Sequence, residues 1–279
     1  MKLVEMTSAC SKRFGDEKSL QLIKDAGFDG FDYTMDVAYD ILFNDGYIDH
    51  VKKIKKLSDE IGLPCLQAHA PSPLMRTIQD VLPLTDIFLR SIEIASMLEC
   101  KYLVIHPGAF LTAEENKIHI YDKLLPYAKE KGVIIATENM FKWKDATETE
   151  TVPASCGTAK DFAYHMQVIK HENFCACMDI GHAEMVNCEG AVKIIKALGN
   201  NIGCLHVHDN DLFDDCHTFP FVGNVNWKEV TKALKDIGYK GNLTFEADAF
   251  MKNYPDELIP ACLSLLEKTG RYLINLIEN

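Results

Sequence analysis

The chain has 279 residues, of which 47% are hydrophobic and 25% are charged, and its formal net charge is −12. These values are ordinary for a globular protein, and the negative charge repels the phosphate backbone of nucleic acids at long range. We therefore do not expect nucleic acid as a partner. No apolar run approaches the roughly 18 residues of a membrane-spanning helix, so we expect no membrane partner either.

Cysteine usage and the N-terminus indicate the compartment. The ten cysteines include no C-x-x-C pair, and the chain opens as a strand rather than as a signal peptide. We expect a cytoplasmic protein whose thiols are small, reduced core residues. No linker or low-complexity tract interrupts the chain, so we expect one domain over residues 1–279.

Short apolar strands alternate with amphipathic, helix-length segments. We expect strands at residues 2–7, 30–35, 65–70, 101–107, 133–139, 174–180, 202–208 and 242–248. We expect helices near residues 16–26, 46–61, 77–98, 113–131, 158–170, 189–199, 226–237 and 256–276, and an irregular insertion at 140–157. Eight strand–helix units imply parallel strands and predict an α/β fold, a single (β/α)8 TIM barrel. A doubly wound open sheet is the alternative, but the first strand lacks its glycine-rich phosphate turn.

Polar residues fall at the carboxyl ends of six consecutive predicted strands, where such barrels place their chemistry. In strand order they are His69, His106, Glu138, Asp179 with the nearby His182, His206 with His208, and Glu246; Asp215 and His217 follow the seventh strand. Imidazoles and carboxylates that are buried together lose their contacts with water, and like charges among them repel. A divalent cation bound between them would compensate for both costs. The mixed ligands suit Zn²⁺, Mn²⁺, Co²⁺ or Fe²⁺ better than Ca²⁺.

Structural interpretations compete with this one. Glu138 could form a buried ion pair with Lys142, and Asp179 could cap the turn in "DIGHA". His208 shares its strand end with His206, so we expect it to orient a ligand or contact the substrate, with Asp209 as its supporting partner. Trp143, together with Phe141 in "ENMFKWK", could form an apolar wall over a sugar or could simply pack.

An ordered set of motifs carries a family resemblance. The motifs are "AHAP" (68–71), "IHPG" (105–108), "TENM" (137–140), "DIGHA" (179–183), "HVHDND" (206–211), "DCHTFPFVGNVNW" (215–227) and "FEAD" (245–248). Over nearly the whole chain, this set resembles the xylose-isomerase-like TIM barrel superfamily. That group includes sugar and sugar-phosphate isomerases and epimerases, inosose-type isomerases and dehydratases, and apurinic-site nucleases of the endonuclease IV type.

The isomerase and epimerase branch implies one divalent ion, Mn²⁺ before Zn²⁺, Co²⁺, Fe²⁺ or Mg²⁺. Its ligands would be Glu138, Asp179, His206 and Glu246, and His182 would contact the substrate. The remaining candidates would line the pocket; these are His69, His106, His208 and His217. Many ketose 3-epimerases of this branch carry an arginine where this chain has Leu212, which weakens that particular assignment.

The nuclease branch implies three zinc ions, and this chain also carries its additional ligands. These are His69, His106, His182, Asp215 and His217. However, the segments "ENMFKWK" (138–144) and "HVHDND" (206–211) resemble the sugar-isomerase-like branch more closely. An added acid in the second segment is also a poor neighbour for a DNA phosphate.

We therefore expect a divalent-metal-dependent isomerase or epimerase of a sugar, sugar phosphate or cyclitol. Glu138 and Glu246 would transfer a proton next to a carbonyl through a metal-stabilised enediolate, and His182 would order the hydroxyls. The alternatives are a trinuclear zinc phosphodiesterase of the endonuclease IV type and a keto-sugar or inosose dehydratase, a lyase. The expected partner is a small carbohydrate; barrels of this kind often pair as homo-oligomers, but no apolar stripe marks an interface.

Overall fold

Eight parallel strands form a barrel in the computed structural model, which describes residues 1–36, 38–144 and 150–279. The strands are β1 (Lys2–Met6), β2 (Gly30–Thr34), β3 (Cys65–His69), β4 (Tyr102–Val104), β5 (Ile134–Glu138), β8 (Phe174–Asp179), β9 (Ile202–His206) and β10 (Asn242–Phe245). Their order in the sheet is β10-β1-β2-β3-β4-β5-β8-β9. A parallel bridge between Val207 and Phe245 closes the barrel beyond β9, which confirms the predicted (β/α)8 fold.

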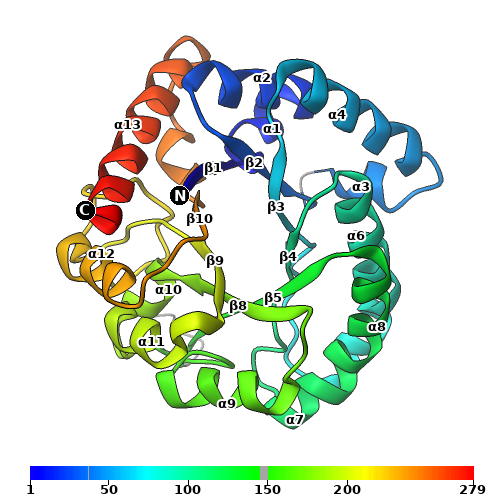
Figure 1. The fold of residues 1–279 in the computed structure, drawn as a ribbon, viewed down its shortest axis with the longest axis vertical. Coiled ribbons are helices and arrows are strands. Elements are labelled where there is room, and N and C mark those ends of the chain that lie inside the picture. Colours follow the sequence, from blue (N-terminus) through cyan, green and yellow to red (C-terminus); the bar gives the residue numbers. More distant parts are fainter. Residues whose placement is uncertain (37, 145–149) are drawn as a thin grey trace.

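Helices form an outer ring around the strands (Figure 1). They are α1 (Ser8–Phe14), α2 (Asp16–Ala26), α3 (Tyr39–Leu42), α4 (Tyr47–Ile61), α5 (Ile78–Val81), α6 (Thr85–Met97), α7 (Ala113–Asn116), α8 (Asp122–Lys131), α9 (Ala159–Ile169), α10 (Ile180–Glu184), α11 (Ala191–Leu198), α12 (Trp227–Asp236) and α13 (Ile259–Glu278). No helix in these described ranges is both long and apolar enough to cross a membrane.

Helix α4 illustrates why the sequence forms these elements. Its apolar residues Val51 and Ile54 are fully buried, whereas Lys52 and Lys53 point to solvent, as expected for an amphipathic helix against a sheet. Gly62 ends the helix with a left-handed backbone conformation (φ 63°) that costs glycine little. Lys52 and Lys53 therefore belong to the solvated face of α4.

The short helices α1, α3 and α10 were not predicted, and three predicted segments have a different internal structure. The helix expected at 77–98 is divided into α5 and α6 by a 3-10 turn at Leu82–Leu84, which contains Pro83. The helix expected at 113–131 contains a π-helical turn at Lys117–Tyr121. The insertion at 140–157 is not irregular throughout, because β6 (Phe141–Trp143) and β7 (Thr151–Pro153) form an antiparallel hairpin.

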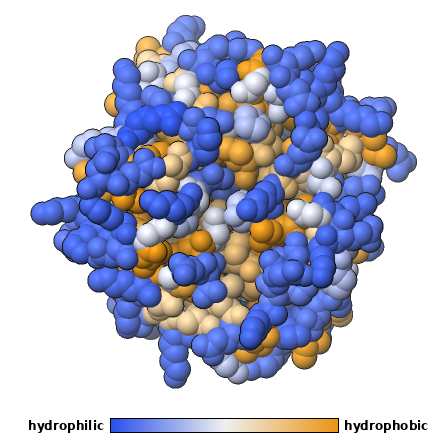
Figure 2. Space-filling model, viewed as in Figure 1, coloured by the Kyte–Doolittle hydropathy of each residue, from blue (hydrophilic) through white to orange (hydrophobic). Residues whose placement is uncertain are grey.

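The inside of the barrel changes from apolar to polar along its axis. A cluster of small, fully buried residues, Val104, Ala136, Cys177 and Cys204, fills the interior between β4 and β9. The larger apolar core lies between the strands and the helices. All ten cysteines are free, as expected. On the face seen in Figure 2, hydrophilic residues cover most of the surface and apolar residues gather nearer the centre.

Candidate active site

Four predicted metal ligands converge at the carboxyl end of the barrel. Glu138, Asp179 and His206 are the last residues of β5, β8 and β9, and Glu246 follows β10. One ligand atom from each lies within 4.8 Å of those of the others. The His206 Nδ1 atom is 3.1 Å from Glu138 Oε2 and 2.9 Å from Glu246 Oε2.

These atoms have the spacing and the surroundings that a divalent cation requires. Neighbouring ligands of an octahedral ion with bonds near 2.1 Å lie about 3 Å apart, close to both distances at His206 Nδ1. Glu138 Oε2, Asp179 Oδ2 and His206 Nδ1 are buried and have no hydrogen-bond partner within the described chain. Buried polar atoms left unpaired cost about 1–3 kcal/mol each. The four residues therefore fit a cation that satisfies them together.

The structural interpretations of Glu138 and Asp179 have different outcomes. Asp179 does cap α10, because its Oδ1 accepts from the N–H of His182 at 2.6 Å, but its Oδ2 stays available. Asn139 fixes the Asp179 backbone through two hydrogen bonds of 2.8 and 2.9 Å. The alternative in which Glu138 pairs with Lys142 does not hold: the Lys142 ammonium instead lies 4.3 Å from the Phe110 ring centroid.

A second cluster shares Glu138 with the first. His69 Nε2 is 3.1 Å from His106 Nε2, which is 3.3 Å from Glu138 Oε2, and the three residues meet the spacing of a metal site. The His69 Nδ1–H donates to the Ala70 carbonyl at 2.7 Å. This hydrogen bond leaves Nε2 to face its neighbours, which is the orientation of a metal-binding imidazole.

A third cluster joins His182, His208, Asp215 and His217. The Asp215 carboxylate lies 3.4 Å from His182 Nε2 and 2.9 Å from His217 Nε2, and both imidazoles donate from Nδ1 to backbone carbonyls. His208 Nε2 is 3.2 Å from Asp179 Oδ1. His206 of β9 and His208 just beyond it therefore both lie in the site.

Charge pairing within the site shifts several pKa values. Burial opposes ionisation of Glu138, but His206 and His106 outweigh it and hold its pKa well below the usual range. Burial likewise disfavours the charged form of His182, yet Asp179 and Asp215 raise its pKa well above the ordinary value. Without a cation, the site is thus a set of carboxylates and imidazolium groups that neutralise one another.

Asp209 does not support the site. Its buried carboxylate accepts from the Trp227 indole at 2.7 Å and from the backbone N–H groups of Phe221 and Val225 at 2.9 and 3.0 Å. It thereby holds the loop between β9 and α12, and the expectation that it orients His208 is wrong. Gly181 instead accommodates His208, since a Cβ there would meet that ring at 2.0 Å.

Asp32 also belongs to the site, although it is not among the predicted site residues. This residue of β2 is fully buried, neither of its oxygens has a hydrogen-bond partner in the described chain, and its Oδ2 lies 3.8 Å from His206 Nε2. It therefore lies behind the imidazole whose Nδ1 faces Glu138 and Glu246. The sequence feature that could have identified Asp32 is the alternation of side chains along β2, which places Asp32 on the same face as Thr34 at the end of the strand.

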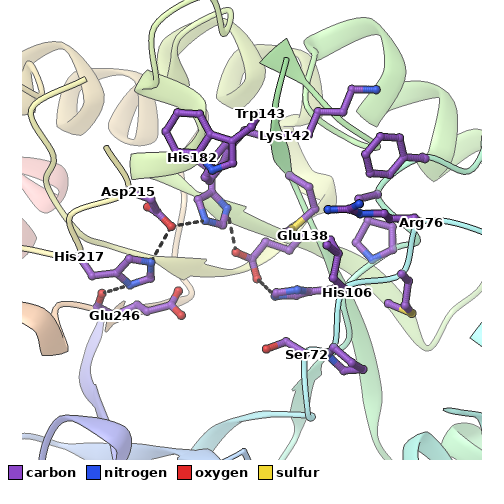
Figure 3. A pocket seen from close by; sticks show the side chains of 18 residues that line it. Ser72, Arg76, His106, Glu138, Lys142, Trp143, His182, Asp215, His217 and Glu246 are labelled. Atoms are coloured by element: carbon purple, nitrogen blue, oxygen red, sulfur yellow. Dashed lines mark hydrogen bonds and ion pairs between the residues drawn. The ribbon is translucent and has the colours of Figure 1, made fainter. Parts of the chain in front are cut away.

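A cavity of about 720 Å³ opens on these residues. Glu138, His182, Asp215, His217 and Glu246 all line it, and Figure 3 shows their side chains directed toward a common space. Phe141 and Trp143 from β6 line the same cavity, and the Phe141 ring lies 5.1 Å from that of His182. The cavity therefore combines a polar group of candidate ligands with an apolar wall, which suits a small carbohydrate.

Comparison with known proteins gives two curated relatives. The chain is 28% identical over 165 residues to an uncharacterized protein of Methanocaldococcus jannaschii, a match that covers 56% of this chain and spans 54% of that protein's length. It is 24% identical over 265 residues to the uncharacterized protein y4fM of Sinorhizobium fredii, with 83% of this chain and 81% of the relative covered.

Solved structures of the same fold include sugar epimerases. A D-tagatose 3-epimerase-like protein superposes with a TM-score of 0.74 at 21% identity, covering 100% of this chain and 98% of its own. The D-allulose 3-epimerase from Methylomonas sp., in complex with D-allulose, has a TM-score of 0.73 at 18% identity, with 99% and 96% covered. The IolI protein with a zinc atom has a TM-score of 0.73 at 17% identity, with 99% and 98% covered.

A family model identifies the family of the chain. The model of the xylose isomerase-like TIM barrel matches residues 20–265, which is most of the chain. The closed barrel and the site at its carboxyl end agree with that match. The chain belongs to the xylose isomerase-like TIM barrel family.

Proposed function

We propose that this chain is a divalent-metal-dependent isomerase or epimerase of a sugar, a sugar phosphate or a cyclitol. The observation that carries the proposal is the pair of carboxylates of Glu138 and Glu246, which approach one nitrogen of His206 from β5 and from the end of β10. Both line the cavity, so a substrate there has a carboxylate on each side. The sugar epimerases of the same fold support the choice of substrate class.

Moving a hydrogen next to a carbonyl requires a base for a weakly acidic C–H and an acid that returns the proton. A cation held by Glu138, Asp179, His206 and Glu246 would supply positive charge where negative charge develops on the substrate oxygens. Glu138 and Glu246 would accept and return the proton at carbon. Their pKa values, lowered by the neighbouring histidines despite burial, keep both carboxylates ionised and able to act as a base at neutral pH.

His182 would position the substrate hydroxyls. Its Nδ1–H donates to the Asn139 carbonyl at 3.0 Å, so the ring is fixed and its Nε2 faces Asp215. The raised pKa of His182 keeps the imidazole protonated, which makes it a hydrogen-bond donor to a hydroxyl oxygen. The aromatic wall of Phe141 and Trp143 would cover the apolar side of the sugar.

Deuterium incorporation tests this function. The chain loaded with Mn²⁺ is incubated in D₂O with ketoses, ketose phosphates and inososes, and deuterium is scored by mass spectrometry at the carbon next to the carbonyl. We expect incorporation with at least one sugar class, and a loss of orders of magnitude in Glu246→Gln and Glu138→Gln. Glu172→Gln, which removes an exposed carboxylate paired with Lys129, is the matched control. Full activity in Glu246→Gln would refute the proposal, and a product lighter by one water would indicate a dehydratase.

The two additional clusters favour one second candidate, a trinuclear zinc phosphodiesterase. In His69, His182 and His217, Nδ1–H donates to a backbone carbonyl and Nε2 faces another candidate ligand, as metal-binding imidazoles do. Three ions there would activate water and hold a phosphate. Elemental analysis at a buffered free Zn²⁺ concentration distinguishes the two: about one ion per chain supports the isomerase, and about three with cleavage of an apurinic-site oligonucleotide support the phosphodiesterase.

A further inference from the structure

Arg76 brings a positive charge into the cavity that holds the candidate metal ligands. It lies in the loop between β3 and α5 and lines the cavity together with His106 and Glu138. Figure 3 shows its side chain extending from the wall of the cavity toward the space on which these residues open. The proposed proton transfer does not use this residue.

The backbone around Arg76 is held in place on both sides. The N–H of Ala109 donates to the Met75 carbonyl at 2.9 Å, and the N–H of Arg76 donates to Asp80 Oδ2 at 3.0 Å. The same oxygen of Asp80 accepts from the N–H and the hydroxyl of Thr77, at 2.7 and 3.0 Å. Asp80 Oδ2 thus already accepts from three other donors, and the Asp80 carboxylate forms no ion pair with the Arg76 guanidinium among the described residues.

Arg76 differs from the other three arginines of the chain. Arg13 and Arg271 form ion pairs with carboxylates, and Arg90 lies 4.7 Å over an aromatic ring. Across residues 1–36, 38–144 and 150–279, no carboxylate forms an ion pair with the Arg76 guanidinium and no carbonyl accepts a hydrogen bond from it. In a chain with 41 acidic and 29 basic residues, Arg76 is an exposed side chain that lines the cavity, and its unpaired guanidinium is available there to bind an anion.

A second cation and an apolar surface extend this side of the cavity. Lys142 of β6 lines the cavity with its ammonium over Phe110, and no carboxylate in the described ranges pairs with it. Two apolar residues also line the cavity: Phe141 is the first residue of β6, and Met140 lies in the segment between β5 and β6. This arrangement provides an apolar surface for a carbon chain between the candidate metal ligands and the cationic side.

We propose that the substrate carries a phosphate or carboxylate group at the end away from its reacting carbons, and that Arg76 binds this group. The planar guanidinium presents two parallel N–H donors, which match two oxygens of either anion, and Lys142 adds positive charge to the lining of the same cavity. The inference rests on the proposed isomerase or epimerase function, because it takes the candidate metal ligands as the place of the reacting carbons. It narrows the substrate class to anionic sugars.

Calorimetry on the full chain loaded with Mn²⁺ tests this subsite. Dissociation constants are measured for D-fructose, D-fructose 6-phosphate and D-glucuronate. We expect one of the charged sugars to bind at least about tenfold tighter than D-fructose, since a charge-assisted hydrogen-bond pair is worth roughly that factor or more. Arg76→Ala should remove this preference. Arg76→Lys should retain only part of it, because the lysine ammonium is a point charge and lacks the two parallel N–H donors of the guanidinium.

A matched control and the melting temperatures exclude indirect effects. Lys56→Ala removes one positive charge from the exposed face of α4, where Lys56 pairs with Glu60, and should bind every sugar as the parent chain does. Arg76→Ala and Arg76→Lys should melt within a few degrees of the parent chain, since the side chain is exposed to the cavity and supports no described contact. Their sugar affinities then report on binding alone.

Each outcome decides between the subsite and the function. Equal affinity for all three sugars, or unchanged affinity for the charged sugar in Arg76→Ala, overturns the anion subsite. If deuterium exchange then still occurs with neutral sugars, the function stands and only the subsite is wrong. Absence of both binding and exchange for neutral and charged sugars alike refutes both. Tighter binding of D-fructose 6-phosphate than of D-glucuronate assigns a phosphate, and the reverse order assigns a carboxylate.

Discussion

Replacing Asp32 by asparagine should weaken metal binding without removing a ligand. Asp32 Oδ2 lies 3.8 Å from His206 Nε2, and the opposite nitrogen of that ring faces Glu138 and Glu246 at 3.1 and 2.9 Å. The carboxylate therefore favours the tautomer with the proton on Nε2, which leaves the Nδ1 lone pair directed at the cation. Asparagine keeps the size and removes the charge.

The expected loss of metal affinity in Asp32→Asn follows from the usual effect of a carboxylate placed next to a metal-binding histidine. Loss of a carboxylate that is hydrogen-bonded to a metal-binding histidine lowers metal affinity by about 10- to 100-fold. Because Asp32 acts on His206 from 3.8 Å, beyond hydrogen-bond distance, we expect the lower end, about tenfold or about 1.4 kcal/mol. The assay is a competition titration of Mn²⁺ against a fluorescent chelator, so it requires no substrate. Asp59→Asn, an exposed change on α4, is the control. A dissociation constant within twofold of the parent value in Asp32→Asn would show that His206 needs no such support.

Three further predictions concern the glycine, the pH dependence and the ion. Gly181→Ala should disrupt the third cluster and lower activity by orders of magnitude, as kinetic assays can measure, because a Cβ would meet the His208 ring at 2.0 Å. Burial opposes protonation of His217, but its other interactions, chiefly the hydrogen bond to Asp215, outweigh burial and raise the pKa of His217 from 6.5 to about 10. The charged imidazole therefore stabilises the metal-free chain fully below about pH 6.5, and this stabilisation is lost as the pH rises through about 10. The difference in melting temperature between the parent chain and His217→Gln should shrink over that window. Removal of the ion with EDTA should lower the melting temperature by on the order of 5 °C, if the metal was present at a hundred times its dissociation constant before removal. An unchanged melting temperature after addition of EDTA would contradict a resident cation.

The barrel and the convergence of the ligands were predictable because each depends on a simple repeat. The alternation of apolar strands with amphipathic helices implies parallel order, and parallel order brings the carboxyl end of every strand to one rim. Glu138, Asp179 and His206 could thus be placed together although they lie far apart in the sequence. The proposed roles of these residues stay predictions, as does the single-domain boundary.

Other features depended on interactions that no local pattern reveals. Pro83 divides the long predicted helix because it lacks the N–H that the helix would need, yet the sequence pattern around it is still amphipathic. Arg76 escaped notice because only the hydrogen bonds of Met75 and Asp80 place its loop against the cavity. Asp32 lies inside a strand rather than at its end, so a search limited to strand ends passes over it.

The position of Glu138 in two clusters makes the occupancies of those clusters interdependent. A carboxylate has two oxygens and can bridge two cations, and ions in such paired sites lie about 3.5–4 Å apart. Repulsion between them would make the first ion bind more tightly than the second. The number of ions per chain would then depend on the free metal concentration. The metal content of a purified sample would therefore reflect the metal concentration to which the protein was exposed, as well as the number of ions that its function requires.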